Sequence, residues 1–116
     1  MSNAMMIALT GLGAFGKKLD VTANNTANVN TDGFKKSRAE MAAAYPDGVK
    51  VTISRENTPG DYVVIGDGTP AMKESSNVSL EEEMTGLITT KNMYESNLMV
   101  IRTDDEMKGE LLDIKA

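Results

Sequence analysis

The stretch IALTGLGAFGKKLDVTANNTANVN, residues 7–30, decides how the first part of this 116-residue sequence folds. Six of its residues recur at alternating spacings of three and four, which is the heptad-like stripe of an amphipathic helix. They are Leu12, Phe15, Leu19, Thr22, Thr26 and Val29. The segment therefore predicts a long helix that ends near residues 28–30.

The same stretch contains GLGAFG, residues 11–16, which matches the G-x-G-x-x-G pattern of dinucleotide-binding loops. Such a loop needs a strand before it and an acidic residue about twenty positions later. The acid near that distance, Asp32, belongs to the turn signal Thr31-Asp32-Gly33 rather than to the end of a strand. We therefore expect the glycines to be small helix residues that let another helix approach closely, and a small dinucleotide-binding enzyme is the weaker alternative.

The composition argues against a catalytic function. The sequence has no cysteine and no histidine, so thiolate nucleophiles, imidazole bases and the usual zinc ligands are missing, and we expect no enzyme, no cofactor and no metal. Basic residues are few and lack interleaved aromatics, so we expect no nucleic acid as a partner. Since we expect no enzyme, we also expect no small-molecule substrate. Residues 1–39 carry a net charge of +3 and residues 40–116 a net charge of −8, so the two parts complement each other.

Targeting signals are missing from the sequence. No apolar run reaches the ~20 residues that span a bilayer, and no signal peptide with a long apolar core is visible. Residues 1–4, Met-Ser-Asn-Ala, resemble the remnant of an expression tag, and we expect the natural start at Met5.

Asparagines gather at the end of the predicted helix, where residues 28–33 are NVNTDG. Asparagine competes with the helix backbone for hydrogen bonds, so Asn24, Asn25, Asn28 and Asn30 are costly unless they bond backbone or neighbouring chains. We expect a positive φ at Gly33 and an apolar anchor at Phe34.

The middle of the sequence, residues 45–76, contains all three prolines and several turn signals, among them Gly66-Asp-Gly. Residues 49–53 alternate apolar and polar side chains and predict a half-buried strand, and residues 62–65 predict a second one. We expect a small β-hairpin-like element here, and a disordered linker is the alternative.

Residues 77–116 predict a second long helix. Ser79 is the expected N-cap and Glu82 the matching residue of a capping box. An apolar stripe then follows at Met84, Leu87, Tyr94, Leu98 and Ile101. A helix over residues 80–114 would be about 50 Å long, which a monomer of this size cannot cover, so it needs a partner.

These segments predict an α+β fold that is mainly α, in which two long terminal helices bracket a small β element. We divide the chain into the possible tag remnant (residues 1–4), an N-terminal helix with its Asn-rich turn (5–44), the β element (45–76) and the C-terminal helix (77–116), together one domain.

Both ends of the sequence resemble one known family. In residues 8–39, Asn-Asn, Ala-Asn, Asn-Thr and Gly-Phe-Lys follow in the order found in the N-terminal signature of the bacterial flagellar rod and hook proteins. Residues 77–84, NVSLEEEM, followed by YESN at 94–97, are similar to the C-terminal signature of that family. The short chain and its turn-rich middle are most similar to the small proximal-rod members.

The resemblance implies a structural subunit of the flagellar basal body. Its terminal helices are expected to build a coaxial tube in the periplasmic rod, with other rod and hook proteins and further copies of the chain as partners. Flagellar type III export, without a cleaved signal peptide, would deliver the protein. A helical adaptor or chaperone is the alternative that shares the stripes but lacks both signatures.

The matching residues are expected, from the resemblance, to pack subunits together. At the N-terminal end they are Asn25, Asn28, Thr31, Gly33, Phe34 and Lys35, and at the C-terminal end Asn77, Val78, Glu83, Met84, Tyr94 and Asn97. The apolar stripes add Leu12, Phe15, Leu19, Leu87, Leu98 and Ile101. Thr26 stands where the family usually has isoleucine, and its hydroxyl is expected to bond the carbonyl one turn back.

Overall fold

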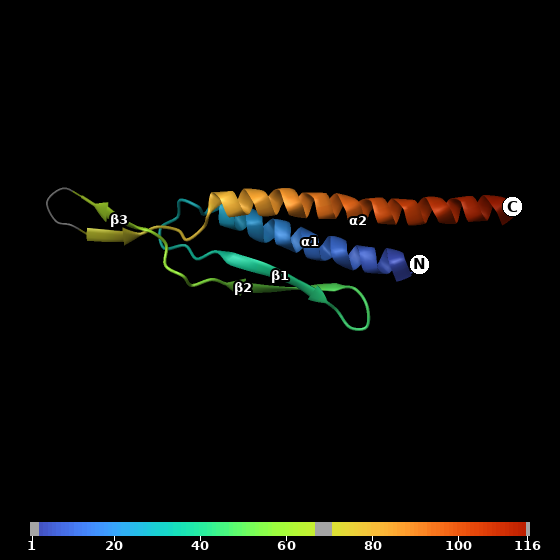
Figure 1. Cartoon of the computed structure of the whole chain (residues 1–116), viewed down its shortest axis with the longest axis horizontal. Coiled ribbons are helices and arrows are strands. Elements are labelled where there is room, and N and C mark those ends of the chain that lie inside the picture. The colour runs from blue at the N-terminus through green and yellow to red at the C-terminus, as the bar shows by residue number, and fades with distance from the viewer. Residues whose placement is uncertain (1–2, 67–70, 116) are drawn as a thin grey trace.

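The computed structural model describes residues 3–66 and 71–115 and is elongated, with extents of 83 × 24 × 14 Å. Two long helices lie side by side, and two short β-hairpins separate them in the sequence (Figure 1). The helices are α1 (Asn3–Ala27) and α2 (Leu80–Lys115). The strands are β1 (Ser37–Ala43), β2 (Val49–Arg55), β3 (Tyr62–Ile65) and β4 (Ala71–Glu74).

The helices α1 and α2 form an antiparallel pair whose register is fixed by two contacts (Figure 1). Asn25 bonds Glu83 near one end, and Gly11 lies against Asn97 further along the pair. By this register the start of α1 lies beside residue 105 of α2. Residues 106–115 therefore extend about 15 Å beyond the start of α1.

Small residues build the seam between α1 and α2. A Cβ atom added at Gly11 would lie 3.1 Å from Nδ2 of Asn97, so this glycine permits the close approach. Within the described residues, the buried hydrophobic side chains are those of Ala8 and Ala14, each 4% exposed. Thr90 is fully buried in the seam, and its hydroxyl has no hydrogen-bond partner among the described residues. The described residues of one chain therefore form almost no hydrophobic core of their own.

The β1–β2 hairpin packs on α1. The two strands are antiparallel, with Ser37 opposite Arg55 and Ala43 opposite Val49. The N–H of Val49 donates to the hydroxyl of Thr10 at 3.1 Å, which holds the tip of the hairpin to α1. Within the described chain α2 contacts α1 but neither strand, so the order across the molecule is α2, α1, hairpin (Figure 1).

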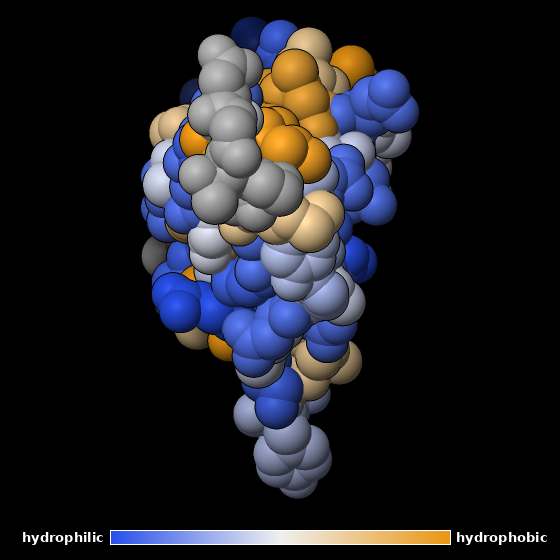
Figure 2. All heavy atoms as spheres, turned by 90° about the vertical axis from the view of Figure 1, so that its left-hand side faces the viewer, coloured by the Kyte–Doolittle hydropathy of each residue, from blue (hydrophilic) through white to orange (hydrophobic). Residues whose placement is uncertain are grey.

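The β3–β4 hairpin projects away from the helices at the opposite end of the molecule from the C-terminus (Figure 1). Its strands are antiparallel and, among the described residues, contact no other helix or strand. Val63, Val64, Ile65 and Met72 are all largely exposed. Figure 2 looks onto this end and shows apolar side chains gathered there.

The predicted fold class is confirmed, and so are the two helices. The helix expected over residues 80–114 is observed as Leu80–Lys115, and the one expected to end near residues 28–30 ends at Ala27. The GLGAFG glycines lie inside α1, which excludes the strand, loop and helix of a dinucleotide site. Among the described residues, no helix is long and apolar enough to cross a membrane.

Two of the four strands found in residues 3–66 and 71–115 were predicted. Residues 49–53 and 62–65 form β2 and β3 as expected, whereas β1 and β4 were missed, and the linker alternative is wrong for the described part. β1 has the sequence SRAEMAA, whose residues individually favour a helix. Pairing with β2 overrides that local preference. Of the turn expected at Gly66-Asp-Gly, residues 67–68 lie outside the described residues, as do residues 1–2 of the possible tag.

Candidate functional site

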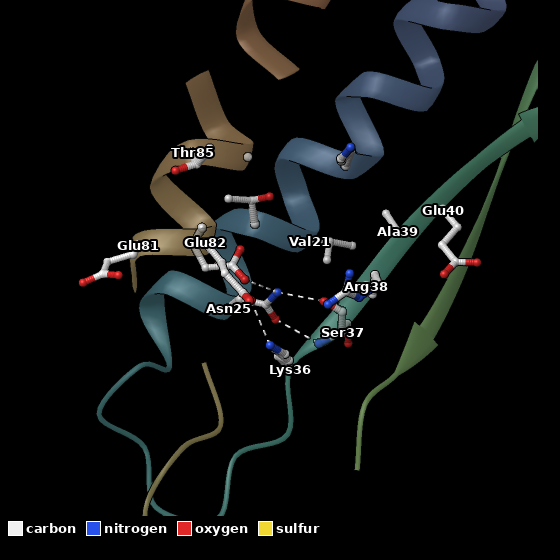
Figure 3. Close-up of a pocket in the computed structure, with 14 residues that line it drawn as sticks. Val21, Asn25, Lys36, Ser37, Arg38, Ala39, Glu40, Glu81, Glu82 and Thr85 are labelled. Carbon is white, nitrogen blue, oxygen red and sulfur yellow. Dashed lines mark hydrogen bonds and ion pairs between the residues drawn. The ribbon is translucent and has the colours of Figure 1, made fainter. Parts of the chain in front are cut away.

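The two signature regions meet where α1 ends and α2 begins. Asn25, in the last turns of α1, is 2% exposed. Its Nδ2 donates to the carbonyl of Ser37 at 2.8 Å and to Oε1 of Glu83 at 3.2 Å, and its Oδ1 accepts from the N–H of Ser37 at 3.0 Å (Figure 3). One amide therefore ties α1, the start of β1 and the first turn of α2 together.

Asn77, just before α2, makes the matching set of bonds. Its Oδ1 accepts from the N–H of Lys36 at 2.7 Å, and its Nδ2 donates to the carbonyls of Glu56 and Thr58, both at 2.9 Å. Its own N–H donates to the carbonyl of Phe34 at 3.2 Å. Asn25 and Asn77 thus hold the backbone of residues 36–37 from two sides, and we call this arrangement the asparagine junction.

Charged side chains surround the asparagine junction. Nζ of Lys36 lies 3.0 Å from Glu82 and 3.4 Å from Glu56, and Nε of Arg38 lies 2.6 Å from Glu56. The hydrogen bond to Glu82 is the main reason that the pKa of Lys36 is raised, and partial desolvation opposes it. Desolvation raises the pKa of Glu56, but the hydrogen bond and charge of Arg38, helped by Lys36, outweigh it and leave that pKa lowered. The lysine is thus held charged between two carboxylates.

Two further carboxylates, Glu83 and Glu74, have pKa values that are shifted in opposite directions. Burial raises the pKa of Glu83, and the hydrogen bond from Asn25 opposes this only in part. The pKa of Glu74 is lowered, first by the hydrogen bond and ion pair with Lys35 and then by the N–H of Gly60, which donates to it at 3.1 Å.

The residues between the helix and β1 follow the predicted turn. Asn28 Nδ2 donates to the carbonyl of Asn24 at 2.8 Å, and the hydroxyl of Thr31 donates to Asn28 Oδ1 at 3.0 Å. Gly33 has the expected positive φ, +68°, and its N–H donates to the carbonyl of Glu74. The expected bond of Thr26 to the carbonyl one turn back is confirmed, because its hydroxyl donates to Thr22 at 2.8 Å.

An open groove of about 640 Å³ lies over the junction, between α1, β1 and the start of α2 (Figure 3). Lys18, Lys36 and Arg38 line it together with the acidic residues 81–83. Lys36 pairs with Glu82 inside the groove, and Arg38 pairs with Glu56 beside it. The described residues hold no cluster of acidic side chains suited to a metal ion. The arrangement is built to hold three segments of backbone in place.

The predicted stripe of α2 divides between two environments. Tyr94, Asn97 and Ile101 are half-buried in the seam with α1. Met84, Leu87 and Leu98 are 53%, 41% and 45% exposed, and in α1 Leu12, Phe15 and Leu19 are half-buried. Val78 and Phe34 are half-buried near the junction, and Thr31 is exposed.

Exposed apolar residues form two rows on α2. At 100° per residue, one row lies on one flank of the face that contacts α1, and the other row lies on the opposite flank. The Leu98 row consists of Leu80, Met84, Leu87 and Leu98, and the Met107 row consists of Met93, Val100, Met107, Leu111 and Ile114.

Sequence reasoning missed the small residues of the α2 seam. Gly86 is half-buried and Thr90 is buried, and with Tyr94, Asn97 and Ile101 they repeat at spacings of four and three. That spacing was visible in the sequence. Reasoning by hydrophobicity favoured the neighbouring row of larger residues instead.

Two family models match the chain in separate segments. Residues 5–35 match the model described as "Flagella basal body rod protein", and residues 70–114 match "Flagellar basal body rod FlgEFG protein C-terminal". The chain belongs to the flagellar basal-body rod family. The two segments contain the two halves of the asparagine junction, Asn25 in one and Asn77 with Glu83 in the other.

Named relatives agree with this family. The chain is 35% identical over 91 residues to the flagellar basal-body rod protein FlgG of Bacillus subtilis, which covers 74% of the chain and 31% of that FlgG. It is 48% identical over 46 residues to the flagellar hook protein FlgE of Caulobacter vibrioides, covering 40% of the chain and 8% of FlgE. A third relative, FlgG of Agrobacterium fabrum, is 54% identical over 38 residues, covering 33% of the chain and 14% of that FlgG. The chain thus spans less than a third of each of these relatives.

Proposed function

We propose that this rod-family protein is a structural, non-enzymatic subunit of the flagellar basal body, which assembles through its terminal helices. Its partners are further copies of the chain and other rod and hook proteins. We place it in the periplasmic rod, exported by the flagellar type III route without a cleaved signal peptide, in a role most like that of the proximal rod protein FlgC.

The observation that carries the proposal is the mismatch between the buried core and the exposed apolar rows. Within the described residues the buried hydrophobic side chains are two alanines, whereas the two rows on α2 contain nine large apolar side chains, each at least 41% exposed. Burying such a side chain contributes about 1.5–3 kcal/mol. Helices of this kind reach their full stability only between subunits.

Family membership and chain geometry favour the rod role over a helical adaptor. Both signature regions match rod-family models, and both contribute to one junction inside the chain. The asparagine junction fixes the angle between the helix pair and the β1–β2 hairpin, so that every subunit presents its apolar rows in the same way. Such uniformity is what a repeating polymer requires of its subunits.

The test uses the purified full chain and replaces Leu98 in the middle of its row. Leu98→Asp places a charge on the exposed row without touching the seam, so we expect a helical chain that no longer sediments as an assembly. Leu98→Met keeps an apolar side chain of similar volume and should assemble like the unchanged protein. Sedimentation velocity measures assembly, and circular dichroism checks the helices. A chain that stays monomeric at every concentration before any substitution would refute the proposal.

A further inference from the structure

The side of the molecule opposite α2 carries a second groove, of about 510 Å³, between α1 and the β1–β2 hairpin. Val21, Val51 and Ile53 form its apolar floor, and Lys17 and Asp20 line it from α1. Ile53 is 54% exposed and Val21 and Val51 are half-buried, so the described residues leave the floor partly uncovered. We call this site the hairpin groove.

The outer face of α2 offers matching chemistry on the other side of the molecule. Ile88 and Met99 are 61% and 68% exposed and are eleven residues apart, which is three helical turns, so they lie on one face. Exposed carboxylates lie about two turns from Ile88 on either side, at Glu81 and Glu95. This face points away from α1, the element on which α2 packs.

The net charge of α2 is opposite in sign to that of the three elements α1, β1 and β2. α2 carries nine acidic and four basic residues, and α1, β1 and β2 together carry five basic and two acidic ones. Lys17 lines the hairpin groove, and Arg55 is exposed on the same face of β2 as Ile53, because alternate strand residues share a face. An acidic helix with an apolar centre therefore suits this site in both charge and hydrophobicity.

We infer that the hairpin groove of one copy receives the outer face of α2 of a second copy. Ile88 enters the groove over Val51 and Ile53, and Glu95 faces Lys17 at its rim. Each chain has the groove on one side and the helix on the other, so the contact is heterologous and can repeat from copy to copy, as a ring or as an open filament. This inference rests on the proposed function, because it specifies one contact of the assembly.

Cross-linking tests the contact directly, because the chain contains no cysteine of its own. Ile88→Cys in one copy is mixed with Ile53→Cys in a size-tagged copy, and a short bis-maleimide joins thiols that lie close together. The matched control is Thr52→Cys, one residue along β2 and therefore on the other face of the hairpin. We expect the 88–53 product to exceed the 88–52 product by about tenfold, the factor that roughly 1.4 kcal/mol of contact preference gives.

Charge exchange gives an independent measurement. Lys17→Glu and Glu95→Lys should each lower the association constant by about tenfold, because each places like charges across the contact. The double variant restores opposite charges and should return to within about threefold of the unchanged chain.

The outcomes separate this inference from the proposed function. One outcome is that the chains sediment as assemblies while the 88–53 cross-link forms no more than the 88–52 cross-link, or while neither forms. That result overturns the hairpin-groove contact and leaves rod assembly standing. A double charge variant no better than the single ones overturns it in the same way. Chains that never assemble overturn the proposed function itself.

Discussion

At the residue scale, the most informative side chains are polar and lie between the two helices. Asn25 and Asn77 were expected from the resemblance to pack subunits, and the structure shows that their amides bond backbone inside the chain. Each bond contributes about 1 kcal/mol, and leaving its buried partner unpaired costs more. These asparagines are therefore residues on which the fold of the single chain depends.

Thr90 gives the first prediction at this scale. Its fully buried hydroxyl has no partner among the described residues, so Thr90→Val removes an unsatisfied polar group and keeps the shape. We expect the free energy of unfolding to rise by about 1–2 kcal/mol, measured by urea denaturation. Thr89→Val is the control, because the exposed Thr89 hydroxyl donates to the carbonyl of Thr85 and should yield no gain. A loss of stability in Thr90→Val would contradict the unpaired hydroxyl.

Glu83 gives a prediction about pH. Burial raises the pKa of Glu83 in the folded chain, so the fold favours its protonated form, and this contribution to stability is lost as pH rises through that pKa. Glu83→Gln keeps an oxygen that accepts from Asn25 and avoids the buried charge. We expect its melting temperature to exceed that of the unchanged chain at pH 7 and the difference to shrink toward pH 4.

The control for Glu83 lies in the same helical turn. Glu81→Gln removes an equal charge from an exposed position in the first turn of α2, where an acid is favourable to the helix dipole. The melting temperature of Glu81→Gln should therefore not exceed that of the unchanged chain at pH 7. Equal melting temperatures for Glu83→Gln and the unchanged chain at pH 7 would contradict the effect of burial.

At the scale of elements, the role of each glycine of α1 depends on how closely α2 approaches it. Gly11 meets Asn97 across the seam, whereas Gly13 and Gly16 have nothing within 4 Å of an added Cβ. The three glycines of GLGAFG look equivalent in sequence, and the helix pair makes only one of them a contact residue. The same logic applies to the hairpins, since β1–β2 packs on α1 and β3–β4 projects free of the described helices.

The glycines yield a paired prediction. Gly13→Ala should raise the free energy of unfolding by about 1 kcal/mol, because alanine favours the helix and meets open space. Gly11→Ala gains the same helix preference, but its Cβ would press on the Asn97 amide at 3.1 Å, so its gain should be clearly smaller. Thermal denaturation of both variants measures the difference. Equal gains would show that α2 does not pack closely at Gly11.

At the scale of the whole molecule, the chain has the shape of a slender slab rather than a globule. It is 83 Å long and 14 Å thick, and much of its large apolar surface is exposed on α2 and the β3–β4 hairpin. Apolar surface on this scale is typical of proteins that bury it against partners.

The whole-molecule prediction concerns protein concentration. If assembly buries the rows of α2, the melting temperature should rise as the chain is made more concentrated, because association stabilises the folded state by mass action. Leu98→Asp should remove that dependence. Thermal denaturation over a hundredfold range of concentration, followed by circular dichroism, measures it. A constant melting temperature for the unchanged chain would argue that its stability does not come from association.

The sequence by itself determined the two helices, the bounds of α2 to within one residue, the positive φ at Gly33 and the family. Local periodicity, capping and turn residues act over a few positions, so they can be recognised without knowing what packs on what. Tertiary structure alone decided that SRAEMAA becomes a strand, because its partner β2 supplies the hydrogen bonds that override a helical preference. It also decided which face of α2 meets α1, since close packing selected the small row with Gly86 and Thr90 and left the larger Leu98 row exposed.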